Sequence, residues 1–249
     1  YSTYLGGASS DRARGIAIDA AGAAYVTGQT TSSEASFPVL NPHSAGASLH
    51  NPGSGNTDAF CAKLSPDGNT LLYCSYLGGA STETGYGIAV DVAGSAFISG
   101  TTNSSDFPVA GPTQCGSGGS ADAFVTKYSP DGGFLAFSTY HGGPSFEYGA
   151  AIAIDMAGAP YITGAVGPSL PTSPGAYDDS YADGGSDSYV ASLVCSCPCW
   201  ADPGGQPGAC DGVYSDVVDV VQTINVAFRN QPSTKAFMCG SERTDVDAN

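Results

Sequence analysis

Residues 73–91 read YCSYLGGASTETGYGIAVD, and this stretch decides the fold because the chain contains it three times. Residues 1–19 read YSTYLGGASSDRARGIAID, and residues 137–155 read FSTYHGGPSFEYGAAIAID. Each copy continues with D-x-A-G, a short β-rich run, a variable polar loop and a run such as DAFVTKYSPDG. A unit of this length that recurs with its motifs in order indicates a repeat architecture.

Each copy contains four strand signals, built from β-branched and aromatic residues; in the second copy they read YCSYL, GIAVD, AFISG and DAFVTKY. The motif D-x-A-G predicts a tight turn, in which the Asp accepts backbone N–H bonds and the Gly takes a positive φ. Asp19, Asp91 and Asp155 are therefore interpreted as turn formers. The motif S-P-D-G predicts a hairpin that leads from the fourth strand of one copy to the first strand of the next.

Taken together, YSTYLGG, GIAVD and AYVTG resemble the signatures of the bacterial β-propeller repeat family SBBP. The resemblance covers residues 1–193, although His141 replaces the Leu of YLGG in the third copy. It implies a propeller-like fold on an extracellular or cell-surface protein, and it implies no particular reaction. We therefore expect an all-β, β-propeller-like fold of three four-stranded antiparallel units, at about residues 1–72, 73–136 and 137–193.

The remaining residues, 194–249, differ in character. They begin with a Cys-rich linker, followed by a run at 215–229 whose apolar residues have the spacing of an amphipathic helix. The chain then ends in RTDVDAN, which resembles the opening of a dockerin-type calcium loop in a degenerate or truncated form. Calcium is the one cofactor that the sequence suggests, with its ligands either at Asp245, Asp247 and Asn249 or in the acidic repeat loops.

The composition bounds the partners. A formal net charge of −16 with only seven Lys and Arg argues against nucleic acid and anionic membranes, which need basic surfaces. No run of about 18 apolar residues is present, so we expect no membrane span. The sequence opens within a repeat-like pattern, and we infer that a leader or upstream sequence was removed or left out.

Eight cysteines in an acidic chain favour disulfides and an oxidising compartment, which agrees with a secreted protein. Cys61 and Cys74 flank the S-P-D-G turn at equal distances, so the sequence predicts that they face each other and form a bridge. A Cys210–Cys239 bridge would close the ends of the helical segment. The spacing C-x-C-x-C at residues 195–199 does not match the usual zinc half-sites.

No catalytic motif is evident. His43, His50 and His141 do not recur between copies, and each is interpreted as a surface or packing residue. Two sets of acidic residues do recur, which indicates a structural role or a ring of cation ligands for the first set and loop anchoring for the second; they are Asp11, Glu83 and Glu147, and Asp58, Asp122 and Asp187. The sequence therefore predicts a protein that is not an enzyme.

Two strand signals have no partner in the chain order. Residues 1–5 form a first strand with no fourth strand before it, and residues 187–193 form a fourth strand with no first strand after it. Three blades are fewer than the typical minimum of four, so closure within one chain is strained unless each repeat contributes more than one blade or the native chain carries more repeats. Otherwise, pairing between chains is predicted. The predicted edge comprises Tyr1, Ser2, Thr3, Tyr4, Leu5, Asp187, Tyr189, Ala191 and Leu193.

These observations favour a secreted structural or adhesive repeat protein that assembles into an extracellular filament with copies of itself or with other extracellular proteins. A module that presents its loops to glycans or proteins is the alternative. A third reading is a fragment of an enzyme whose catalytic domain lies outside these residues.

Overall fold

The computed structural model describes residues 1–43, 56–182 and 184–193, and in these ranges it contains β-strands and no helix. The first sheet consists of β1 (Asp11–Ile18), β2 (Ala24–Thr30), β3 (Asp58–Leu64) and β4 (Leu71–Leu77). The second consists of β5 (Glu83–Val90), β6 (Ala96–Thr102), β7 (Asp122–Tyr128) and β8 (Leu135–His141). The third has three strands, β9 (Glu147–Ile154), β10 (Pro160–Val166) and β11 (Asp187–Ser192). All these ladders are antiparallel, as expected for propeller-like repeats.

The boundaries of the sheets do not coincide with the boundaries of the sequence repeats. The first strand signal of the second copy forms β4, which pairs with β3 and closes the preceding sheet. The third copy closes the second sheet with β8 in the same way. Both S-P-D-G hairpins are thus confirmed. The expected set of three four-stranded units is corrected, for the described residues, to two four-stranded sheets and one three-stranded sheet.

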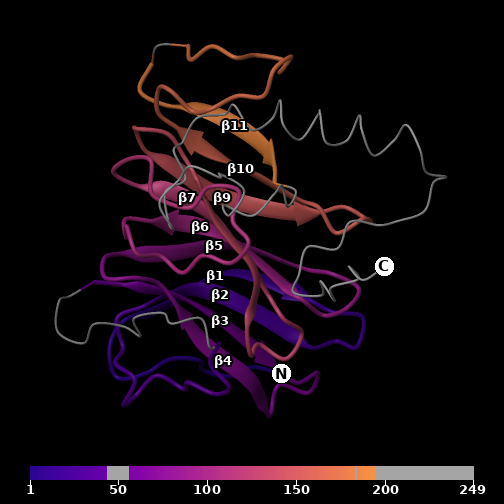
Figure 1. The fold of residues 1–249 in the computed structure, drawn as a ribbon. Helices are drawn as coiled ribbons and strands as arrows, with labels where there is room; N and C mark the ends of the chain where they lie inside the picture. Colours follow the sequence, from indigo (N-terminus) through magenta and orange to yellow (C-terminus); the bar gives the residue numbers. More distant parts are fainter. Residues whose placement is uncertain (44–55, 183, 194–249) are drawn as a thin grey trace, which may run out of the picture.

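The three sheets stack face to face, with the first and third on opposite sides of the second (Figure 1). The first strand of each sheet lies over the preceding one, since β5 packs against β1, β2 and β3, and β9 packs against β5, β6 and β7. Buried aromatic residues fill the first interface, among them Tyr25, Tyr73 and Phe124. The second interface contains Val125, Ile162 and other apolar side chains. The described ranges contain no helix that is long and apolar enough to cross a membrane.

The D-x-A-G turns form as the sequence predicts. Asp19 Oδ1 accepts hydrogen bonds from the backbone N–H groups of Ala21 and Ala23, and Asp91 and Asp155 repeat this pattern in their own turns. The following glycine adopts a positive φ, which is 88° at Gly22, because this region is open to glycine at little steric cost. The prediction that these aspartates are turn formers is confirmed.

Candidate functional site

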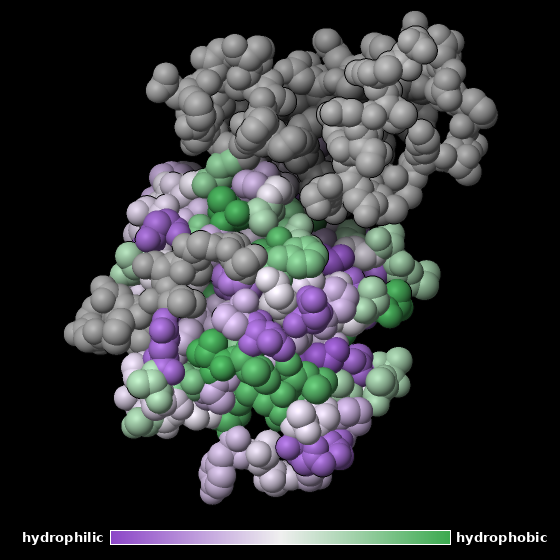
Figure 2. Space-filling view, turned by 60° about the horizontal axis from the view of Figure 1, so that its bottom comes forward, coloured by the Kyte–Doolittle hydropathy of each residue, from purple (hydrophilic) through white to green (hydrophobic). Residues whose placement is uncertain are grey.

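The outer face of the first sheet exposes side chains that the other sheets bury. In β5, Ile88 packs against the first sheet and is 9% exposed. Ile16 occupies the same repeat position in β1 and is 68% exposed, because no sheet precedes the first one among the described residues. Figure 2, which brings the bottom of Figure 1 forward, shows apolar side chains gathered on this side of the molecule. We call this surface the leading face; Ile16 and Ile18 are exposed on it, and Val26 and Leu64 lie on the same face but are buried.

The opposite end of the stack shows the complementary exposure. Tyr161 in β10 is 42% exposed, whereas Tyr25 at the same repeat position in β2 is 0% exposed. Val190 in β11 is 79% exposed, and its counterpart Cys61 in β3 is 0% exposed. We call this surface, which contains Tyr161, Thr163, Ser188 and Val190, the trailing face.

The N-terminal residues lie on the leading face without forming a strand. A Cβ atom built on Gly68 would meet the ring of Tyr1 at 2.1 Å, and one built on Gly132 would meet the ring of Tyr73 at 2.5 Å. Tyr1 therefore contacts the β3–β4 turn as Tyr73, in β4, contacts the β7–β8 turn. Leu5 packs against the buried cluster of the first sheet, on the same face as the other leading-face residues.

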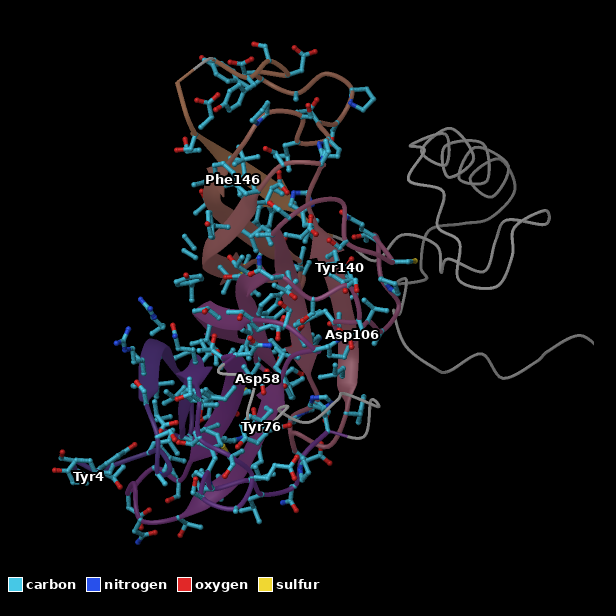
Figure 3. All side chains as sticks on the ribbon, turned by 90° about the vertical axis from the view of Figure 1, so that its left-hand side faces the viewer. Tyr4, Asp58, Tyr76, Asp106, Tyr140 and Phe146 are labelled. Atoms are coloured by element: carbon cyan, nitrogen blue, oxygen red, sulfur yellow. The ribbon has the colours of Figure 1, made fainter. Side chains whose placement is uncertain are left out.

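Tyr4, in the N-terminal segment, has no neighbouring sheet to pack against on its outer side among the described residues. Its counterpart Tyr76, in β4, is 1% exposed and packs against Phe37, whereas Tyr4 is fully exposed. Figure 3 shows Tyr4 extending away from the body of the molecule. Residues 1–5 thus occupy the place of an outer strand, with one side on the first sheet and the other side lacking the sheet to which such a strand belongs.

Among the described residues, the third sheet has no outer strand. β3 and β7 are each paired on both edges, while β11 is paired only with β10 among the described residues. The predicted edge residues Tyr189 and Leu193 are buried against the second sheet, so the backbone of β11, and not these side chains, forms the open edge. The structure places residues 1–5 and β11 at opposite ends of the stack and does not pair them with each other.

A groove of about 240 Å³ separates the N-terminal segment from the β3–β4 hairpin. Thr3, Tyr4 and Asn69 supply its polar side chains, and the other lining residues are Leu5, Gly6, Pro38, Leu64, Gly68 and Leu71. Polar and apolar atoms therefore contribute about equally to the lining, which offers hydroxyl and amide groups. Such a lining suits packing against another polypeptide better than acid–base chemistry.

The first recurrent set of acidic residues anchors loops. The backbone N–H groups of Gly7, Gly79 and Gly143 donate to Asp11, Glu83 and Glu147, at 2.7, 3.1 and 2.9 Å. These bonds support the structural alternative over the ring of cation ligands. Within the three described ranges, no three His, Cys, Asp or Glu side chains are grouped so that they could hold a metal ion.

In the second recurrent set, Asp122 and Asp187 anchor loops as predicted. Asp122 Oδ2 accepts from Ser117 Oγ and from the Gly118 N–H, and Asp187 Oδ2 accepts from the Ala182 N–H. Both aspartates therefore hold the loop that precedes their strand.

Glu147 differs from its counterpart Glu83. Glu83 Oε1 accepts from the hydroxyls of Thr102 and Ser104, at 2.7 and 2.5 Å. Val166 and Pro168 stand at the two corresponding positions in the third copy, and Glu147 Oε1 is buried without a hydrogen-bond partner. Burial and the nearby charge of Asp122 raise the pKa of Glu147 to about 7, against the effect of the Gly143 N–H.

The two histidines that the structure describes have packing roles. His43 is buried, and its Nε2 atom lies 3.0 Å from the carbonyl oxygen of Tyr76. The ring of His141 lies 5.7 Å from the ring of Tyr189, and burial lowers the pKa of His141 to about 4. His50 lies outside the described residues.

The predicted Cys61–Cys74 disulfide is wrong. Both thiols are free and buried, and they lie in different clusters on opposite faces of the first sheet. The register pairs Cys61 with Ser75 and Ala62 with Cys74, because an irregularity between Lys63 and Leu64 shifts the ladder by one residue. Several predicted residues lie outside the described ranges, namely Cys210, Cys239, Asp245, Asp247 and Asn249.

Comparison with known proteins agrees with the repeat reading. Residues 1–34 and 72–108 match the family model described as beta-propeller repeat, SBBP. Each matched segment covers a YSTYL-type signal and the two strand signals that follow it; the first ends at Glu34 and the second at Pro108. No curated protein matches the chain. These two segments are thus similar to SBBP propeller repeats, and the stacked antiparallel sheets are consistent with that similarity.

Proposed function

We propose that this chain is a non-enzymatic structural repeat protein, secreted or held at the cell surface, whose copies join by strand complementation. Residues 1–5 of one copy pair with β11 of another and complete its third sheet. The observation that carries this proposal is the match between the two ends. Residues 1–5 lie in the place of an outer strand at one end, and at the other end β11 has no strand on its outer edge among the described residues. A strand added at an open edge satisfies backbone N–H and C=O groups that otherwise face solvent.

A contact of this kind is heterologous, because it joins two different surfaces of the same chain. Repetition of a heterologous contact produces a ring if the rotation closes and a filament if it does not. The low content of charged residues, 12%, and the net charge of −16 agree with an extracellular protein. The mixed polar and apolar lining of the groove beside residues 3–6, which contains no acidic or basic side chain, supports a packing role for this end.

Deletion of residues 1–7 tests the proposal. The full chain should sediment as concentration-dependent oligomers, and the deletion variant as a monomer that keeps the β-sheet signal in circular dichroism. A synthetic YSTYLGG peptide, added to the full chain, should occupy the β11 edge and reduce the size of the oligomers, whereas a scrambled peptide should not. A monodisperse monomer at all concentrations of the full chain would contradict the proposal.

A further inference from the structure

Beyond the strand, we infer that the leading face of one copy docks on the trailing face of a second copy and so forms one more inter-sheet interface. This inference rests on the proposed function and assigns a second, larger surface to the same assembly. The evidence is the repetition within the chain, where two interfaces of this kind are already present.

The internal interfaces show what each face contributes. At the first, Ile88 and Val90 of β5 pack on a cluster that includes Tyr25 and Cys61. At the second, Ile152 of β9 packs on a cluster that includes Val125. In both cases the inner strand of the later sheet supplies branched aliphatic side chains. The earlier sheet supplies residues of its third and fourth strands, Cys61 and Tyr73 at the first interface and Val125 and Phe137 at the second.

The two ends of the stack expose the same two kinds of surface that pack against each other inside the chain. The leading face presents Ile16 and Ile18, which are 68% and 67% exposed, at the positions of Ile88 and Val90. The trailing face presents Tyr161 and Val190 at the positions of Tyr25 and Cys61. Exposed apolar side chains that would be buried by one more stacking step mark an interaction surface. The partner that carries the complementary pattern is a second copy of this chain.

The N-terminal segment supports the same register. Tyr1 and Leu5 lie on the leading face where Tyr73 and Leu77 of β4 lie on the second sheet. When the trailing face of a second copy docks here, its β11 therefore lies beside residues 1–5. The two segments are then placed as β3 and β4 are within the first sheet. Strand pairing and face docking thus belong to one rigid arrangement.

At one position, the interface between two copies is sterically more crowded than the interface between the first two sheets. A Cβ atom on Gly15 would lie 2.8 Å from the carbonyl oxygen of Tyr86, and a Cβ atom on Gly87 would lie 2.9 Å from Cα of Ala151. The third sheet has Ala151 at this repeat position, so its methyl group requires the second copy to shift by a few tenths of an ångström. The interface between copies is therefore expected to be weaker than the one between the first two sheets.

Two charge variants and their mixture test the inference. Ile16→Glu should block the leading face, Val190→Glu should block the trailing face, and each variant alone should sediment as a monomer at concentrations where the unmodified chain associates. Each variant retains one intact face, so an equimolar mixture should form a two-chain species and nothing larger. Both side chains are exposed, and their replacement should leave the fold intact, as thermal unfolding can verify.

Val92→Glu and Met156→Glu are matched controls, because Val92 and Met156 are fully exposed in turns between strands. They should associate like the unmodified chain. If the two face variants also do so, face docking is wrong, and this includes the case in which another part of the same chain covers the trailing face. A mixture that stays monomeric, or controls that lose association equally, would overturn it as well.

The results separate this inference from strand complementation. Loss of association on deletion of residues 1–7, with unaffected face variants, would refute face docking alone. Loss in the face variants, with an unaffected deletion variant, would refute strand complementation alone. A full chain that remains monomeric would refute both.

Discussion

The ring of Tyr1 lies against the Cα atom of Gly68, at the tip of the β3–β4 turn, so closely that a Cβ atom there would meet it at 2.1 Å. Gly68 also has a positive φ of 69°, which favours glycine. This contact holds the first residue of the chain on the leading face. It links the local geometry of one turn to the proposed assembly.

Gly68→Ala should therefore displace residues 1–5 and abolish association in sedimentation experiments. The substitution also strains the turn by about 1 kcal/mol or more, which should lower the free energy of unfolding. Gly22→Ala is the matched control, because Gly22 has a φ of 88° and its nearest neighbour, Pro66 Cβ, would be 3.5 Å from the new atom. Gly22→Ala should lose similar stability and keep association. Equal association in both variants would show that Tyr1 is not part of the contact.

Glu147 should make the protein less stable as the pH rises. Folding raises the pKa of this carboxyl from 4.5 to about 7, so the folded state holds the proton more tightly than the unfolded state does. The stabilising contribution is complete below about pH 4.5 and is lost as the pH rises to about 7, at no more than about 1.4 kcal/mol per pH unit. Burial also raises the pKa of Asp122, which adds to the slope in the same direction.

Glu147→Gln should flatten this dependence and make the variant more stable than the unmodified chain at pH 8, as measured by urea unfolding at pH 5 and pH 8. Glu83→Gln is the comparison. The Gln side chain would have to direct its amide N–H₂ at a hydroxyl of Thr102 or Ser104 or at the N–H of Gly79, and should cost roughly 1–3 kcal/mol. An unchanged pH slope in Glu147→Gln would show that this carboxyl does not titrate as described.

Cys61 and Cys74 should resist alkylation in the folded protein. Burial raises the pKa of Cys61 to about 12 and also raises the pKa of Cys74, so neither thiol is an accessible thiolate at pH 8. Iodoacetamide should label both only after denaturation. Trypsin cleaves after Lys63, between the two cysteines, so a disulfide would appear in the peptide map as two linked peptides, which would contradict the structure.

Asp91→Ala should destabilise the protein more than Asp155→Ala. Both aspartates accept two backbone N–H bonds in equivalent turns, and their loss should cost about 1–2 kcal/mol. Asp91 also lies 3.2 Å from Lys127 Nζ, whereas Ser192 stands at the corresponding position opposite Asp155. The ion pair should add about 0.5 kcal/mol. Urea unfolding of Asp91→Ala, Asp155→Ala and Lys127→Met measures the contribution of this ion pair. Equal losses of unfolding free energy in Asp91→Ala and Asp155→Ala would show that the ion pair contributes nothing.

The repeated motifs were sufficient to predict the turns and the strands β1 to β11, whereas the strand predicted at residues 1–5 does not form. Turn formation at Asp19 and Asp91 depends on local hydrogen bonds that D-x-A-G specifies by itself, and S-P-D-G specifies the hairpins in the same way. Sheet membership depends on pairing between segments, and the sequence order alone does not show that YCSYL completes the sheet before it.

The register error at Cys61 has a physical cause. An irregularity beside the turn shifts the ladder by one residue, and a shift of one residue turns a side chain to the other face of a strand. The lack of hydrogen-bond donors to Glu147 Oε1 could not be predicted from the sequence for a different reason. Val166 and Pro168 lie in the sequence some 20 residues after Glu147, and only the fold brings these positions together. The exposure of Ile16, by contrast, could have been predicted from the repeat alignment, because Ile16 matches Ile88 but no earlier repeat precedes it in this sequence.

Hydrogen–deuterium exchange at two protein concentrations tests the central claim most directly, that the two ends of one chain complete each other in another. With rising concentration, the amides of residues 1–5, β1 and β11 should gain protection, and those of β6 and β7, in the middle sheet, should not change. Protection that is independent of concentration at both ends, or residues 1–5 paired with β11 of the same molecule, would contradict the account.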